Sequence, residues 1–197
     1  LPIATTDPRA HGQAIDDWRK FQKFGIADKD IVVLMDPDVV LLSHQWRKEL
    51  DAAFANPHMG MWGAGAKEDF GPRVHASMMA IRGEVFNTLE RSFTPCADPR
   101  EREWRDTGGL YCMFAQAAGW QVQPLERGPD WHGYSAWWGM KPVLSEGFMV
   151  VPLWVHLGGG THSDPTRMTM WQRMRNWRQV RRRQRFITQV RAQLSNS

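Results

Sequence analysis

The segment that decides the fold is DKDIVVLMDPD, residues 28–38. Its centre, residues 31–35, is continuously apolar and rich in β-branched side chains, and carboxylates flank it on both sides. A short apolar run of this kind is typical of a strand that is buried on both faces in an α/β protein. We therefore expect a central strand that ends where the polar residues begin, at Asp36.

Working outward from this strand, hydrophobic periodicity predicts strands and helices that alternate along the chain, which indicates an α/β domain. Ser43 is expected to cap the N-terminus of a helix at residues 43–56, and Asp106 with Thr107 the N-terminus of a helix at residues 108–118. Residues 126–146 are expected to form a long loop rich in aromatic residues. Further strands are expected at residues 59–66, 75–81, 120–125 and 148–156, and residues 39–42 are expected to be extended or turn-like. Helices are expected at residues 17–24, 43–56, 83–92, 108–118 and 167–194.

Length and composition exclude several classes of protein. The chain has 197 residues, the size of one domain, and its 42% hydrophobic and 23% charged residues argue against wholesale disorder. No run of eighteen apolar residues occurs, so the sequence predicts no transmembrane helix. The two cysteines, Cys96 and Cys112, provide neither a disulfide framework nor zinc-ligand spacing, which fits a reducing compartment and predicts a cytoplasmic protein.

Positive charge is concentrated at the C-terminal end. Residues 167–197 hold nine Arg and no acidic residue, so the rest of the chain has a net charge of −5. Apolar residues recur at helical spacing in this stretch, which predicts a basic amphipathic helix. Packing of this helix on the domain is the first interpretation, and contact with an anionic membrane surface is the second. Nucleic-acid binding is not expected, because no recognition motif accompanies the arginines.

Asp36 and Asp38 follow the central strand, and ligands bind beyond the carboxyl ends of strands in open α/β sheets. Two carboxylates one residue apart, with Pro37 restricting the turn, can share a hard divalent cation such as Mn²⁺ or Mg²⁺. Such a cation keeps free positions for phosphate oxygens. An ordinary turn is the alternative, because Asp and Pro are common turn residues.

The segment around these carboxylates resembles the central segment of GT-A fold glycosyltransferases, in which a strand delivers an Asp-x-Asp motif to a metal-bound nucleotide sugar. RAHGQAID (residues 9–16) is similar to the stretch that lines the donor site in that family. DTGG (residues 106–109) resembles the start of the acceptor-side helix, and WVHLGGG (residues 154–160) resembles the late segment whose His completes the metal site. The resemblance runs from about residue 9 to residue 162.

This resemblance implies a Rossmann-like GT-A fold with a mixed central sheet over residues 1–166, followed by the C-terminal helix over residues 167–197. Members of the family carry an additional N-terminal portion, with the first strand and the base-binding turn. Few residues precede the motif in this chain, and we expect that this portion is missing.

The resemblance also implies the roles of individual residues. Asp106 would be the general base, in competition with its role as a helix cap. The alternative for His156 is a purely structural role, and His162 is the substitute for His156 at the same place. His75 is expected to be packed. The metal ligands would be Asp36, Asp38 and His156; the donor contacts His11, Gly12, Asp36, Gly158 and Gly159; and the acceptor contacts Trp104 and Trp131.

The activity expected from these roles is transfer of a sugar from a nucleotide-diphosphate sugar to a hydroxyl group of a carbohydrate or lipid-linked acceptor, with Mn²⁺ or Mg²⁺ as cofactor. The C-terminal helix would add peripheral membrane contact. Two alternatives stay open. One is a non-catalytic GT-A-like module that binds or scaffolds within a larger assembly. The other is a metal-dependent nucleotidyltransferase, which can use the same two carboxylates.

Overall fold

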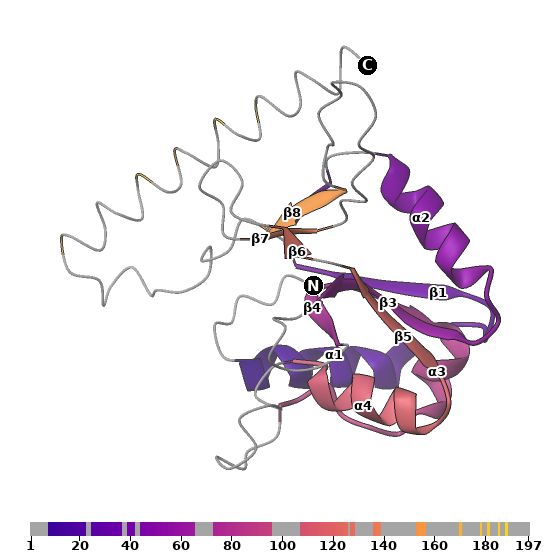
Figure 1. Ribbon diagram of the computed structural model, residues 1–197. Coiled ribbons are helices and arrows are strands. Elements are labelled where there is room, and N and C mark those ends of the chain that lie inside the picture. Colours follow the sequence, from indigo (N-terminus) through magenta and orange to yellow (C-terminus); the bar gives the residue numbers. More distant parts are fainter. Residues whose placement is uncertain are drawn as a thin grey trace.

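The computed structural model describes residues 8–22, 25–36, 39–41, 44–65, 73–95, 107–125, 127–128, 136–138 and 153–156, together with residues 170, 178, 181, 185 and 188. Helices and strands are mixed along this part of the chain, which confirms the predicted α/β class (Figure 1). The elements are α1 (Pro8–Gln22), β1 (Ile31–Met35), β2 (Val39–Leu41), α2 (Gln45–Phe54), β3 (Met59–Gly65), β4 (Val74–Arg82), α3 (Gly83–Thr88), α4 (Gly109–Ala117), β5 (Gln121–Leu125), β6 (Arg127–Gly128), β7 (Ala136–Trp138) and β8 (Trp154–His156).

The larger sheet contains four strands in the order β1-β4-β3-β5. β4 is antiparallel to β1 and to β3, whereas β3 and β5 are parallel. β1, β3 and β5 therefore run in the same direction, and their carboxyl ends lie at the same end of the sheet. The sheet is mixed, as expected, and a ligand site is expected beyond these carboxyl ends.

β1 has the predicted bounds but not the predicted burial. Among the described strands it pairs only with β4, so it lies at the edge of the sheet. Val33 and Met35 are 38% and 49% exposed, whereas Val32 packs in the core. The prediction of a central strand buried on both faces is therefore wrong for the described part of the chain. An apolar run indicates a strand, but the neighbours of that strand decide its burial.

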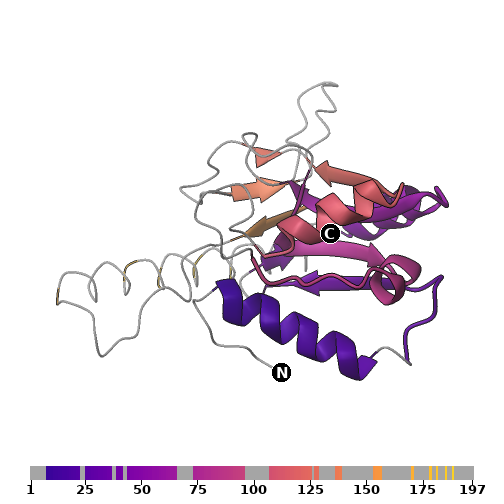
Figure 2. The ribbon, with the colours of Figure 1, turned by 90° about the horizontal axis from the view of Figure 1, so that it is seen from below.

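Helices cover both faces of the larger sheet. α1 and α4 lie across one face (Figure 2), and α2 lies against the other. The core under α1 and α4 contains Ile15, Val32, Met61, Val74, Met79, Ile81, Val85, Phe86, Phe93, Tyr111, Cys112, Ala115 and Val122. The core under α2 contains Leu50, Phe54, Met59, Trp62, Ala64, Met78, Ala80, Leu153 and Trp154. This two-sided burial explains why β3 and β4 are buried along nearly their whole length.

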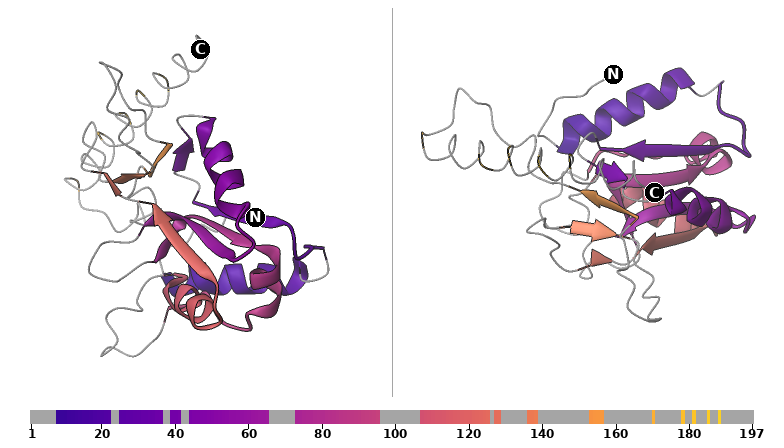
Figure 3. Two further views of the ribbon diagram at one scale, coloured as in Figure 1. Left: turned by 45° about the vertical axis from the view of Figure 1, so that its right-hand side comes forward. Right: turned by 90° about the horizontal axis from the view of Figure 1, so that it is seen from above.

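A second, smaller sheet has the strand order β2-β8-β7-β6, with all neighbours antiparallel. Figure 3 shows its short strands beside the larger sheet. The rings of Trp62 and Trp154 pack edge to face, with their centroids 5.5 Å apart, so the second core joins the two sheets. The sequence predicted only a loop for residues 126–146, and the pairing of β6 with β7 corrects this. These strands are too short for periodicity to reveal them.

The helices differ from the prediction mainly at their ends. α1 begins at Pro8 rather than at residue 17, and proline is favoured in the first turn of a helix. α3 ends at Thr88, so residues 89–92 leave the predicted helix as an extended segment. That segment runs back beside α1, where its backbone accepts and donates hydrogen bonds described below.

Both predicted helix caps are wrong. The N-cap of α2 is His44 rather than Ser43, and it makes no side-chain capping bond. The N-cap of α4 is Gly108 rather than Asp106 or Thr107. Gly108 has a φ of +83°, and a Cβ atom there would lie 2.8 Å from Cε of Met79. The positive φ therefore selects glycine at this position, because other residues are strained in this left-handed conformation, whereas the Met79 methyl group could move aside for a Cβ atom.

The C-terminal stretch is described only at residues 170, 178, 181, 185 and 188, each of which is helical and exposed. Met170 belongs to the apolar stripe that was expected to pack on the domain, yet it is 85% exposed. The rest of the predicted helix lies outside the described residues. Within the described part of the chain, no helix has the length and apolar character needed to cross a membrane.

Candidate functional site

Asp36 lies at the carboxyl end of β1 and continues its pairing with β4. The backbone N–H of Asp36 donates to the carbonyl oxygen of Ser77 at 2.9 Å, one step beyond the pair formed by Met35 and Met78. The Asp36 side chain is 21% exposed. A carboxylate is thus held on a rigid strand end, at the side of the sheet where β3 and β5 also end.

His11 meets Asp36 at this end of the sheet. Its Nε2 atom lies 3.7 Å from Oδ1 of Asp36, and the His11 side chain is 31% exposed. This separation is too long for a hydrogen bond, so the contact is electrostatic when the imidazole is protonated. Two of the residues predicted to bind the donor are therefore brought together, one from α1 and one from the end of β1.

Gly12, another predicted donor contact, has a packing role in the structure. A Cβ atom at this position would lie 2.5 Å from Cα of Thr94 and 2.7 Å from the carbonyl oxygen of Phe93. Both atoms belong to the backbone and cannot move aside easily. Gly12 therefore allows α1 to lie directly on the segment that follows α3, which sets the position of His11.

Asp16 holds the same helix in place, although it was not among the site residues predicted from the sequence. It is only 7% exposed, and its carboxylate accepts the backbone N–H of Phe93 at 2.9 Å. The hydroxyl groups of Ser92 and Thr94 also donate to it. In the sequence Asp16 lies just before the helix predicted at residues 17–24, and no local signal there marks it as a buried carboxylate.

His156 is brought back to the motif through the small sheet. Its backbone pairs in register with Val39, three residues after Asp36, and with Ala136 on the other side. Its side chain lies outside the described residues. The pairing of β2 with β8 nevertheless places two predicted metal-binding segments, far apart in sequence, next to one another.

The remaining predicted site residues lie outside the described part of the chain: Asp38, Trp104, Asp106, Trp131, Gly158, Gly159 and the substitute His162. Among the described residues, no group of three or more His, Cys, Asp or Glu side chains is arranged to hold a metal ion. Of the predicted metal ligands, the structure therefore describes only the side chain of Asp36, and the imidazole of His11 lies beside its carboxylate.

His75 and Ser77 of β4 also face this region. His75 is half-buried, as expected for a packed residue, and its Nδ1 atom accepts the backbone N–H of Ser77 at 3.0 Å. A neutral His75 therefore carries its proton on Nε2. Ser77 is fully buried, and its hydroxyl group has no hydrogen-bond partner among the described residues.

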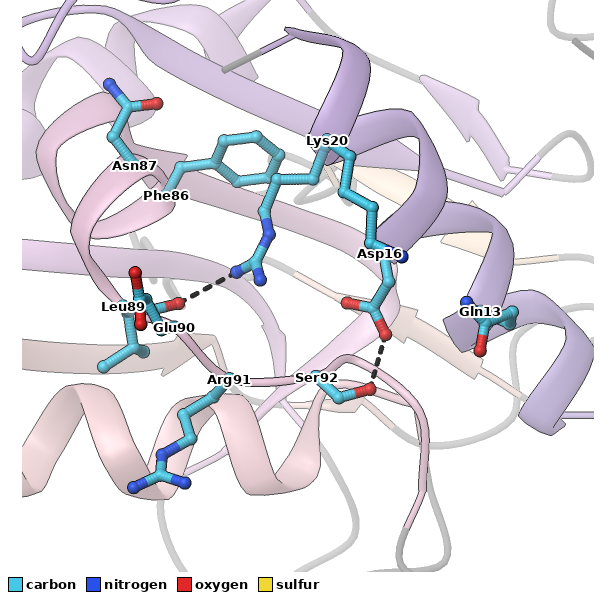
Figure 4. Close-up of a pocket in the computed structure, with 10 residues that line it drawn as sticks. Gln13, Asp16, Lys20, Phe86, Asn87, Leu89, Glu90, Arg91 and Ser92 are labelled. Carbon is cyan, nitrogen blue, oxygen red and sulfur yellow. Dashed lines mark hydrogen bonds between the residues drawn. The ribbon is translucent and has the colours of Figure 1, made fainter.

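A pocket of about 470 Å³ lies elsewhere, between α1 and the segment after α3 (Figure 4). Its main polar groups serve the fold: Asp16 holds residues 92–94, and Arg19 donates to the carbonyl oxygen of Leu89 at 2.9 Å. The guanidinium group of Arg19 also lies 5.8 Å from the ring centroid of Tyr111. We therefore place the candidate site at the carboxyl end of β1 rather than in this pocket.

Comparison of the chain with protein-family models, with curated proteins and with solved structures finds no match.

Proposed function

We propose that this chain is a metal-dependent glycosyltransferase domain with a GT-A-type fold. The observation that carries the proposal is the meeting of three segments at the carboxyl end of β1. Asp36 ends that strand, His11 of α1 lies 3.7 Å from it, and β8 returns His156 to register with Val39. All three segments are among those that resemble the GT-A fold family. They are far apart in the sequence, so their order along the chain does not by itself make them neighbours.

The chemistry proposed for this place follows from the residue types. A carboxylate is a preferred ligand for Mn²⁺ or Mg²⁺, and Asp36 on its rigid strand end fits that requirement. Asp38 and His156 are the further ligands that we propose. A divalent cation bound there would neutralise the charge that develops on the leaving nucleoside diphosphate. His11 and the backbone N–H groups of Gly158 and Gly159 would bind the diphosphate oxygens.

The acceptor side of the proposal rests on the segment before α4. Asp106 would accept the proton of the acceptor hydroxyl as its oxygen attacks the anomeric carbon of the donor sugar. Trp104 and Trp131 would contact the rings of a carbohydrate or lipid-linked acceptor. We also propose a cytoplasmic location, with membrane contact through the C-terminal helix.

Titration calorimetry tests this proposal. The full chain is titrated with Mn²⁺ and then with the diphosphates of uridine, guanosine, cytidine, adenosine and thymidine. We expect Mn²⁺-dependent binding of one of them, which Asp36→Asn weakens by roughly 10-fold or more. Asp51→Asn is the matched control, because Asp51 is exposed on α2 and pairs with Arg47 at 3.0 Å.

The outcomes separate the candidate functions. Binding that depends on Asp36, followed by transfer of the sugar to an acceptor as seen by mass spectrometry, supports the glycosyltransferase. Transfer of the nucleotide instead would support a nucleotidyltransferase. If neither Mn²⁺ nor any of the five diphosphates binds, the proposal fails for this chain, and a non-catalytic module becomes the better account.

A further inference from the structure

A buried hydroxyl group lies next to the proposed metal-binding carboxylate. Ser77 stands directly opposite Asp36 on the neighbouring strand, because its carbonyl oxygen accepts the Asp36 N–H at 2.9 Å. Ser77 is 0% exposed, and its hydroxyl group has no hydrogen-bond partner among the residues that the structure describes. A buried polar group without a partner is unfavourable and rare, so this one calls for an explanation.

The Ser77 side chain shares a sheet face with the Asp36 carboxylate. Side chains alternate along a strand, so Ser77 lies on the same face as Met79 and Ile81. Those two residues belong to the core under α1 and α4. The Asp36 carboxylate is on this face as well, because it contacts His11 of α1.

Directly opposed residues of an antiparallel pair have Cβ atoms about 5 Å apart, which places their short polar side chains within reach of one another. The Ser77 hydroxyl is a hydrogen-bond donor, and an ionised carboxylate only accepts. The Ser77 hydroxyl, which stands opposite Asp36, can therefore donate to the Asp36 carboxylate.

We propose that Ser77 is a positioning residue, whose hydroxyl group donates a hydrogen bond to the Asp36 carboxylate when that carboxylate holds a divalent cation. The inference rests on the proposed metal site. It adds a residue from β4 that neither the Asp-x-Asp pattern nor the resemblance includes. The hydrogen bond leaves one carboxylate oxygen directed to the cation, and hydrogen bonds to metal-ligating carboxylates of this kind commonly tune metal affinity.

The test compares Mn²⁺ affinity with the stability of the metal-free chain. In Ser77→Ala we expect Mn²⁺ to bind roughly 10-fold more weakly by calorimetry. The melting temperature without metal should stay unchanged or rise, because the substitution removes a buried hydroxyl that has no partner in that state. Ser92→Ala is the matched control. It should lower the metal-free melting temperature, since Ser92 donates to Asp16, and leave the Mn²⁺ affinity unchanged.

Each outcome decides the inference. Unchanged Mn²⁺ affinity in Ser77→Ala, while the unsubstituted chain binds Mn²⁺, overturns the positioning role and leaves the proposed function intact. A lower melting temperature of metal-free Ser77→Ala also overturns it, because the hydroxyl would then have a structural partner. If the unsubstituted chain does not bind Mn²⁺, the metal-dependent function fails and this inference fails with it.

Discussion

Replacing Asp16 by alanine should weaken the attachment of α1 to the rest of the domain. The carboxylate is 7% exposed and accepts three hydrogen bonds, one from the backbone of Phe93 and two from the hydroxyl groups of Ser92 and Thr94. Alanine leaves the buried Phe93 N–H without an acceptor, whereas the two hydroxyl groups, which are not fully buried, can turn to water.

The magnitude follows from these contacts. A buried donor left without an acceptor destabilises a protein by about 2 kcal/mol, and the loss of two hydrogen bonds to a charged group adds about 1–2 kcal/mol after their return to water. We therefore expect Asp16→Ala to lower the free energy of unfolding by about 3–4 kcal/mol. For a chain of this length, that corresponds to a melting temperature lower by roughly 10 °C.

Urea unfolding, followed by tryptophan fluorescence and by circular dichroism, measures this change. Asp16→Asn keeps one acceptor oxygen and should fall between alanine and the unsubstituted chain. Asp17→Ala is the control on the same helix, because Asp17 and its partners among the described residues, Gln13 and Lys20, are exposed. The free energy of unfolding of this variant should match that of the unsubstituted chain. A loss below about 1 kcal/mol for Asp16→Ala would refute the argument that a buried carboxylate anchors α1.

Three further substitutions test the packing and hydrogen bonding of the domain. Gly12→Ala should destabilise the chain by about 1–3 kcal/mol in urea unfolding, because its Cβ would meet the backbone at Thr94; an unchanged midpoint would contradict that contact. Burial raises the pKa of Tyr111, so the folded chain keeps this proton above pH 10 while the unfolded chain loses it. Stability should therefore fall as pH rises above about 10, and Tyr111→Phe should remove part of that fall in alkaline urea titrations. Arg82→Ala should destabilise by about 2–3 kcal/mol in thermal unfolding, since its guanidinium donates to three backbone carbonyls; a loss under 1 kcal/mol would show that water replaces it.

The sequence by itself determined most of the secondary structure and the type of residue at the candidate site. β1 begins and ends where a continuous apolar run meets carboxylates, and α4 ends at Ala117, two residues before Gly119, whose φ of +88° suits glycine. These features depend on interactions within a few residues, which hydrophobic periodicity and turn preferences record. For the same reason, Asp36 could be chosen as a site residue from its place after the strand.

Only the tertiary structure decided which of these segments meet. The contact of His11 with Asp36, the return of β8 to β2 and the burial of Ser77 beside Asp36 each join segments that are distant in the sequence. The roles of Gly12 and Asp16 depend on the segment at Phe93 and Thr94, which packs against them and is distant in the sequence. Such pairings follow from the burial of apolar surface and the satisfaction of polar groups over the whole domain, and no local stretch of sequence records that balance.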